Sequence, residues 1–182
     1  MTFSHLFFFS GRISPKSIMV SQMTGAWDDP YCGLETQPCK SIKYAIETRT
    51  IDGDAILIDG GCGEYIYNIS ETIIIDKQLT ITGLLNRQEC EYPLLMTTSS
   101  AQFPGGFAMF DVRSNLNTSL LRYTMTLPST WYHYASIFSV NGSESAIQLQ
   151  VSDSSLTNVW GIITFVTENN NVNFENCNFS IL

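Results

Sequence analysis

The sequence predicts an all-β protein: a right-handed parallel β-helix, or solenoid, that starts with a short capping α-helix. At Asp52 the spacing of apolar residues changes from the helical period of about 3.6 to the strand period of about 2. The strands that follow are three to five residues long and are separated by one to four residues. Such separators are too short for a helical crossover between parallel strands, so the strands stay parallel only if each coil stacks on the previous one.

Composition excludes two classes of function. Of the 182 residues, 44% are hydrophobic and 14% are charged, the net charge is −8, and no Lys or Arg follows Arg122. Nucleic-acid binding and polybasic membrane contact both require clustered cations. Ser, Thr and Asn supply the polarity instead, which is typical of a β-rich extracellular protein. We therefore expect no nucleic-acid partner and an extracellular or cell-surface location.

Two regions are expected along the chain. We expect residues 1–24 to be a disordered or leader segment. Their only apolar run, residues 6–9, is shorter than the ~7–15 residues of a signal-peptide core, so no clear signal peptide is predicted. Residues 25–182 form the β-helix domain. No stretch approaches the ~20 apolar residues that cross a bilayer, so no membrane span is predicted.

A loop and a helix open the domain. Residues 25–38 contain turn-forming Asp, Gly and Pro residues and are expected to be a loop. Residues 39–50 predict a short helix, in which Ile42, Ala45 and Ile46 share one apolar face. Because only that face is apolar, the helix must cover another part of the fold.

Short strands and two internal repeats follow. Residues 55–58, 65–69, 73–75 and 79–81 have strand character. Residues 151–156 align with 174–179 at an offset of 23, and residues 108–112 align with 136–140 at an offset of 28. These offsets have the size of solenoid coils whose turns differ in length. The alternative interpretation is that they are ordinary strands and loops of a β-sandwich.

The opening of the domain resembles that of pectin-lyase-like parallel β-helix proteins. The similarity lies in Asp28, Cys32-Gly33, residues 38–42 (PCKSI), Ala45-Ile46, Gly53-Asp54, residues 63–65 (GEY), residues 73–75 (III), Lys77 and residues 79–83 (LTITG). The resemblance implies that the helix caps one end of the solenoid. Residues 174–179 resemble a later coil of that family. The chain ends at Leu182 in what reads as mid-coil, which predicts a C-terminally truncated domain.

Acidic residues are assigned no catalytic role. Enzymes of this fold place several acids on one face, often with calcium or a basic residue. Asp52 and Asp54 flank Gly53, and Asp28-Asp29 precedes Pro30, so both pairs are interpreted as turn formers. The acids in the presumed coils occur singly, at Asp111, Asp153 and Glu175.

One aromatic segment is the candidate carbohydrate-binding site. Trp131, Tyr132, His133 and Tyr134 combine faces on which sugars stack with edges that form hydrogen bonds. The alternative is a hydrophobic cover over a wide coil.

The cysteines and sequons are compatible with secretion but do not by themselves indicate it. Cys32 and Cys39 enclose a short turn-rich loop and are expected to form a disulfide, whereas Cys62, Cys90 and Cys177 are interpreted as small buried side chains. No CxxC pair exists and the chain has two His, so neither a metal nor a cofactor is predicted. Four N-x-[ST] sequons make Asn68, Asn117, Asn141 and Asn178 candidate glycosylation sites.

Together these features predict a non-catalytic β-helix domain of a secreted or cell-surface protein with a structural, adhesive or glycan-contact role. Its expected partners are glycans or other surface proteins. Two alternatives stay open: a polysaccharide lyase or glycoside hydrolase whose site is completed by further C-terminal coils, and a β-sandwich binding module.

Overall fold

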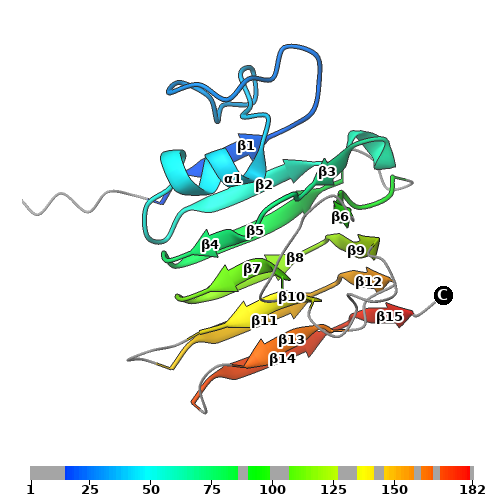
Figure 1. The fold of residues 1–182 in the computed structure, drawn as a ribbon. Coiled ribbons are helices and arrows are strands. Elements are labelled where there is room, and N and C mark those ends of the chain that lie inside the picture. The colour runs from blue at the N-terminus through cyan, green and yellow to red at the C-terminus, as the bar shows by residue number, and fades with distance from the viewer. Residues whose placement is uncertain are drawn as a thin grey trace, which may run out of the picture.

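The computed structural model describes residues 15–85, 90–98, 107–126, 135–141, 146–157, 161–165 and 169–180. Within them the chain is built of short strands in three sheets (Figure 1), and every pairing between named strands is parallel. The prediction of an all-β fold with one short helix is confirmed.

We number the sheets I to III in the order in which the chain visits them after the helix. Sheet I contains β1 (Ser17–Val20), β2 (Ala55–Asp59), β5 (Leu79–Leu84), β8 (Leu116–Ser119), β11 (Gln148–Ser152) and β14 (Asn171–Glu175). Sheet II contains β3 (Ile66–Asn68), β6 (Leu94–Thr98), β9 (Arg122–Thr126), β12 (Ser155–Thr157) and β15 (Asn178–Ser180). Sheet III contains β4 (Ile73–Ile75), β7 (Phe107–Val112), β10 (Ala135–Val140) and β13 (Ile163–Phe165).

From β2 onward the chain visits the sheets in a fixed cycle. It passes from sheet I to sheet II to sheet III and returns to sheet I, where the next strand pairs with the strand from the previous cycle. Each sheet therefore grows by one strand per cycle, and sequence neighbours lie in different sheets. This order explains why the strands are short, since each one covers only one side of the cycle.

The strand registers confirm both predicted repeats. Val151 pairs with Phe174, and Leu156 pairs with Phe179, at the predicted offset of 23. Phe138 pairs with Phe110 in the repeat of offset 28. The apolar residues that matched in sequence therefore occupy equivalent positions in successive strands.

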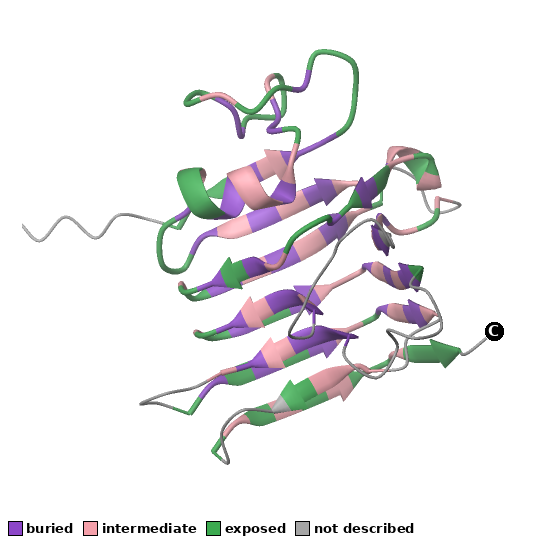
Figure 2. Cartoon of the chain, viewed as in Figure 1, coloured by how far each residue is buried: buried purple, intermediate pink, exposed green. Residues whose placement is uncertain are grey.

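Stacked side chains form the core between the sheets. In sheet I one inward-facing column runs through Ile18, Ile56, Ile81, Thr118 and Val151, all of them buried (Figure 2). In sheet III the rings of Phe110 and Phe138 stack with their centroids 5.8 Å apart. Burial of each large apolar side chain in these stacks contributes about 1.5–3 kcal/mol to folding.

The helix is shorter than predicted. It consists of α1 (Ile42–Tyr44), which continues as a π-helical turn, η1 (Ala45–Arg49), and it buries Ile42, Ala45 and Ile46 as expected. Residues 39 and 40 are not helical because Cys39 forms a bridge with Val20. The Ser41 hydroxyl instead caps the helix by accepting a hydrogen bond from the Tyr44 N–H.

Regular structure starts earlier than the expected boundary at residue 25. Strand β1 lies within the predicted leader segment, pairs with β2 and buries Ile18 and Val20. Four residues with a single alternation are too short to stand out in the sequence, and the pairing partner lies 38 residues further on. Residues 1–14 lie outside the described residues.

None of the helices in the described ranges combines the length and hydrophobicity that a bilayer crossing requires.

Candidate functional site

An open groove on the outer face of sheet I is the candidate site. It has a volume of about 240 Å³ and lies over β5, β8 and β11. Five side-chain amides line it, and we call it the amide groove: Gln78, Asn115, Asn117, Gln148 and Gln150. Thr80, Gly53, Leu79 and Leu116 complete the lining.

A repeated tripeptide places these amides. Each repeat has an inward-facing aliphatic residue between two polar residues: Gln78-Leu79-Thr80, Asn115-Leu116-Asn117, Gln148-Leu149-Gln150 and Asn171-Val172-Asn173. The register aligns Leu79 with Leu116, Leu116 with Leu149, and Leu149 with Val172. Because side chains alternate across a strand, the flanking polar residues form two parallel columns on the outer face.

Backbone contacts fix the first column. The Asn115 side-chain carbonyl accepts a hydrogen bond from the Gln148 N–H at 2.9 Å, and the Asn115 backbone carbonyl accepts one from the Leu79 N–H at 3.1 Å. The Gln78 carbonyl in turn accepts from the Gly53 N–H at 2.8 Å. These bonds join Gln78 and Asn115, which directly precede β5 and β8, to the backbone of neighbouring cycles.

The groove is polar but uncharged. None of its nine lining residues is ionisable, and Asn117, Gln148 and Gln150 are exposed. An amide side chain offers two N–H donors and one acceptor oxygen, so it can either donate a hydrogen bond to a hydroxyl group or accept one from it. The arrangement suits a ligand rich in hydroxyl groups and has no cation for an acidic one.

A second cavity, of about 180 Å³, lies between the helix and β3, and Lys40, Lys43, Asn68 and Glu71 are among its lining residues. The Lys43 ammonium lies 2.8 Å from the Glu71 carboxylate and 3.8 Å from that of Glu47. The hydrogen bond to Glu71 raises the pKa of Lys43 above its ordinary value. This cation is therefore already paired within the protein.

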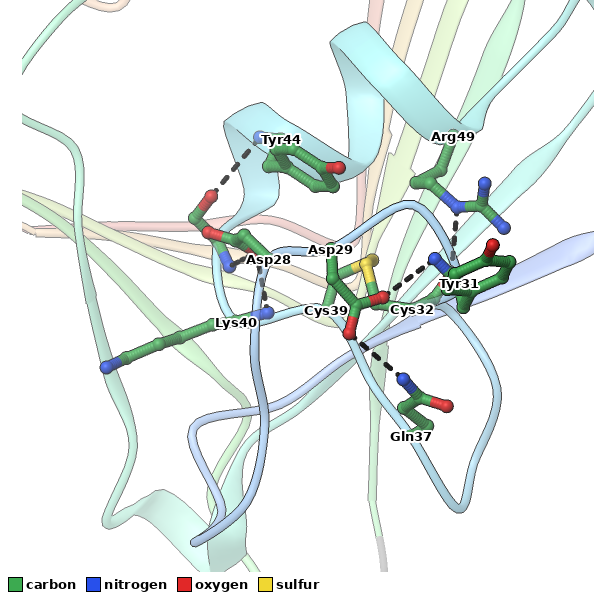
Figure 3. Close-up of a disulfide and its surroundings, with 10 residues drawn as sticks. Asp28, Asp29, Tyr31, Cys32, Gln37, Cys39, Lys40, Tyr44 and Arg49 are labelled. Carbon is green, nitrogen blue, oxygen red and sulfur yellow. Dashed lines mark hydrogen bonds between the residues drawn. A yellow bond between two sulfur atoms is a disulfide. The ribbon is translucent and has the colours of Figure 1, made fainter.

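The N-terminal loop is held by its acids and a disulfide (Figure 3). Cys32 and Cys39 form a disulfide, and the Asp28 carboxylate accepts hydrogen bonds from the backbone N–H groups of Lys40 and Ser41 at 2.8 and 2.9 Å. Asp29 accepts from the Tyr31 N–H at 2.7 Å. Both acids thus bind the backbone of the loop to itself.

The second acidic pair also shapes a turn. Asp54 is fully buried and accepts from the N–H groups of Lys16 and Ile51, each at 2.9 Å. Asp52 accepts from the Gln78 N–H at 2.9 Å and so supports the edge of the amide groove. The interpretation of these acids as turn formers agrees with their contacts.

Of the single acids in the coils, Asp111 lies in sheet III, whereas Asp153 and Glu175 lie at the end of neighbouring strands of sheet I. Asp111 is in sheet III, where Arg113 donates to its carboxylate at 2.6 and 2.8 Å. Asp153 follows sheet I and accepts from the Asn176 amide at 3.3 Å, while Glu175 ends β14. Among the described residues no group of three His, Cys, Asp or Glu side chains has the geometry to hold a metal ion.

The interpretation of the remaining cysteines was wrong for two of them. Cys62 and Cys90 form a second disulfide, which joins the turn after β2 to the turn after β5. Stacking of successive cycles brings these turns together, although 28 residues separate the two cysteines. Cys177 has a free thiol and is half-buried.

The predicted binding and modification residues have varied positions. Trp131, Tyr132, His133 and Tyr134 lie outside the described residues. Asn68 and Asn178 are exposed in β3 and β15, and Asn141 is half-buried directly after β10. Asn117 lies in the amide groove itself.

Sequence reasoning missed the amide groove, although its signal is present. No one residue type is common to all four tripeptides at either polar position, and the spacing between the tripeptides varies. A search for polar-aliphatic-polar triplets with Asn, Gln or Thr at both ends would have aligned them.

Comparison of the chain with protein-family models, with curated proteins and with solved structures finds no match.

Proposed function

We propose that the chain is a right-handed parallel β-helix of the pectin-lyase-like kind that contacts neutral glycans through the amide groove. The cyclic order of the three parallel sheets supports a solenoid. The right-handedness of nearly all parallel crossover connections supports the hand.

The proposed setting is a non-catalytic domain of a secreted or cell-surface protein. Two disulfides support passage through an oxidising compartment. The structural contacts of Asp28, Asp29, Asp52 and Asp54 support a role for these acids in folding and not in chemistry.

The two columns of polar side chains carry the glycan proposal. Thr80, Asn117 and Gln150 are aligned in register across neighbouring strands. Strands in a sheet lie about 4.8 Å apart, which is close to the repeat of an extended β-linked glycan. A glycan lying across the strands would therefore meet one polar side chain of the column with each sugar.

The test is calorimetric titration with neutral β-linked oligosaccharides. A Gln148→Ala/Gln150→Ala variant should bind about tenfold more weakly, because two hydrogen bonds of roughly 0.5–1.5 kcal/mol each are lost. Thr124→Ala, which removes an outward-facing polar group from sheet II, should bind like the wild type.

Three results would contradict the proposal. They are no binding of any neutral glycan, equal losses in the two variants, and release of shorter sugars during the titration. The last would favour a polysaccharide-cleaving enzyme.

A further inference from the structure

A whole glycosylation sequon lines the cavity between the helix and β3, which we call the helix cavity. Its lining comes from two parts of the chain: Gln22 with residues 40–43, and residues 67–71 with Ile73. The sequon, residues 68–70, lies within the second part. The helix cavity therefore combines a candidate modification site with the place where the helix meets the first cycle of strands.

The backbone of the sequon turns its two recognition residues outward. Ile69 is buried, and its N–H donates a hydrogen bond to the Met96 carbonyl at 2.7 Å. Asn68 and Ser70, on either side of Ile69, are exposed. An N-linked sugar is attached to the side-chain nitrogen of asparagine. A sugar on Asn68 would therefore start at the lining of the cavity and leave the core undisturbed.

Contacts within the protein hold the two parts of the lining together. The Gln22 side-chain amide donates to the Ile66 carbonyl at 2.8 Å, and Lys43 Nζ lies 2.8 Å from a carboxylate oxygen of Glu71. The cavity is thus shaped before a sugar enters it, which lowers the ordering cost of binding. Its volume is about 180 Å³. Ligand pockets usually have roughly 300–1,000 Å³, so this cavity suits one sugar and not a longer chain.

The polar groups of the helix cavity fit the first sugar of an N-linked glycan. That sugar, N-acetylglucosamine, carries hydroxyl groups and an acetamido group. Four polar side chains of the lining can form hydrogen bonds with such groups: those of Gln22, Lys40, Ser41 and Ser70. We infer that Asn68 carries an N-linked glycan whose first sugar occupies the helix cavity and ties the helix to the first cycle of strands.

The modification is a group transfer from a lipid-linked oligosaccharide diphosphate. The Asn68 side-chain nitrogen loses a proton to solvent and forms a bond to C1 of the first sugar. The bond from C1 to the diphosphate breaks, and the diphosphate leaves with the lipid, so nothing is oxidised or reduced. The inference rests on the proposed secreted setting and not on ligand binding by the amide groove, so the two proposals can fail separately.

The full chain, secreted from a eukaryotic host behind a signal peptide of that host, tests the inference. Peptide mass spectrometry should find Asn68 modified. Trimming with an endoglycosidase that leaves only the first sugar should not change the melting temperature. Ser70→Ala, which lacks the sequon, should melt about 2–4 °C lower, the shift expected for one or two lost hydrogen bonds in a chain of this size. Ser70→Thr keeps the sequon and should match the wild type.

Two variants separate binding in the cavity from a general effect of glycosylation. Ser180→Ala removes the sequon of Asn178, which is exposed in β15, and should not change the melting temperature. Lys40→Ala removes a polar group of the cavity and should cost more in the glycosylated wild type than in Ser70→Ala. If Ser70→Ala is not secreted, Asn68→Gln takes its place in each comparison.

Four results would overturn the inference. They are an unmodified Asn68 in the secreted wild type, a melting temperature that falls to that of Ser70→Ala on trimming, equal effects of Ser70→Ala and Ser180→Ala, and an equal cost of Lys40→Ala with and without the Asn68 sequon.

Discussion

Gln150 of β11 lies directly beside Asn117 of β8 in the parallel register of sheet I, and both side chains line the amide groove. Asn117 also begins a sequon, whose Ser119 shares a 3.1 Å hydrogen bond with Thr82. One asparagine therefore belongs both to the proposed binding surface and to a candidate modification site.

Modification of Asn117 and glycan binding should exclude each other. An N-linked glycan at Asn117 would cover the groove, so protein modified there should not bind neutral oligosaccharides. Ser119→Ala removes the sequon and keeps the Asn117 amide, and should restore binding in protein from a glycosylating host. Ser70→Ala removes the Asn68 sequon and is the matched control. Peptide mass spectrometry measures how much of Asn117 is modified, and calorimetry measures oligosaccharide binding by the same protein. Tight binding by protein modified at Asn117 would refute the prediction.

Gly83 should tolerate no larger side chain. A Cβ at this position in β5 would lie 1.9 Å from the Leu120 carbonyl oxygen and 2.8 Å from Pro93 Cδ. Gly83→Ala should therefore lower the free energy of unfolding by about 3 kcal/mol, the upper end of the usual overpacking cost. Thr82→Ala, at the neighbouring outward-facing position, should cost about 1 kcal/mol or less. Urea denaturation measures both, and equal losses would contradict the close packing of β5 against the Leu120 turn.

The Cys62–Cys90 disulfide should stabilise the fold more than the Cys32–Cys39 disulfide. The two close loops with sequence separations of 28 and 7 residues, so the chain-entropy estimates are about 3.5 and about 2.5 kcal/mol. Cys62→Ala/Cys90→Ala should therefore lose more unfolding free energy than Cys32→Ala/Cys39→Ala. Denaturation without reductant gives the comparison. The reverse order would indicate that packing around the N-terminal loop outweighs loop closure.

Stability should fall at alkaline pH. Burial is the largest cause that raises the pKa of both the Tyr67 and the Tyr123 phenol in the folded protein. In the unfolded chain these phenols ionise near pH 10. Above that pH the unfolded state binds fewer protons than the folded state, so the unfolding free energy decreases as pH rises. Tyr123→Phe should show a shallower decrease, and identical slopes in variant and wild type would contradict this account.

The parts of the fold that the sequence predicted depend on local alternation or on inward-facing residues. The offsets of 23 and 28 could be aligned because Phe110 and Phe138, like Leu156 and Phe179, are apolar residues at positions that pair in register in successive strands. Strand β1 escaped prediction because it is short and pairs with a distant strand.

The candidate site was less predictable than the fold. Sequence reasoning looked for acids and aromatic residues, whereas the groove is made of single amides that become a surface only when strands stack. Leu79 and Leu116 are paired although 37 residues separate them, because a full cycle through sheets II and III lies between them. The disulfide between Cys62 and Cys90 could not be predicted for the same reason, because the two cysteines come together only when successive cycles stack.

The central claim, that the amide groove receives a neutral glycan, is tested most directly by NMR of the side-chain amide groups. On titration with a neutral β-linked oligosaccharide, the NH₂ resonances of Asn117, Gln148 and Gln150 should shift together and saturate, and an acidic oligosaccharide should leave them unchanged. The absence of shifts in these three amides, or shifts confined to the Trp131–Tyr134 segment, would contradict the account.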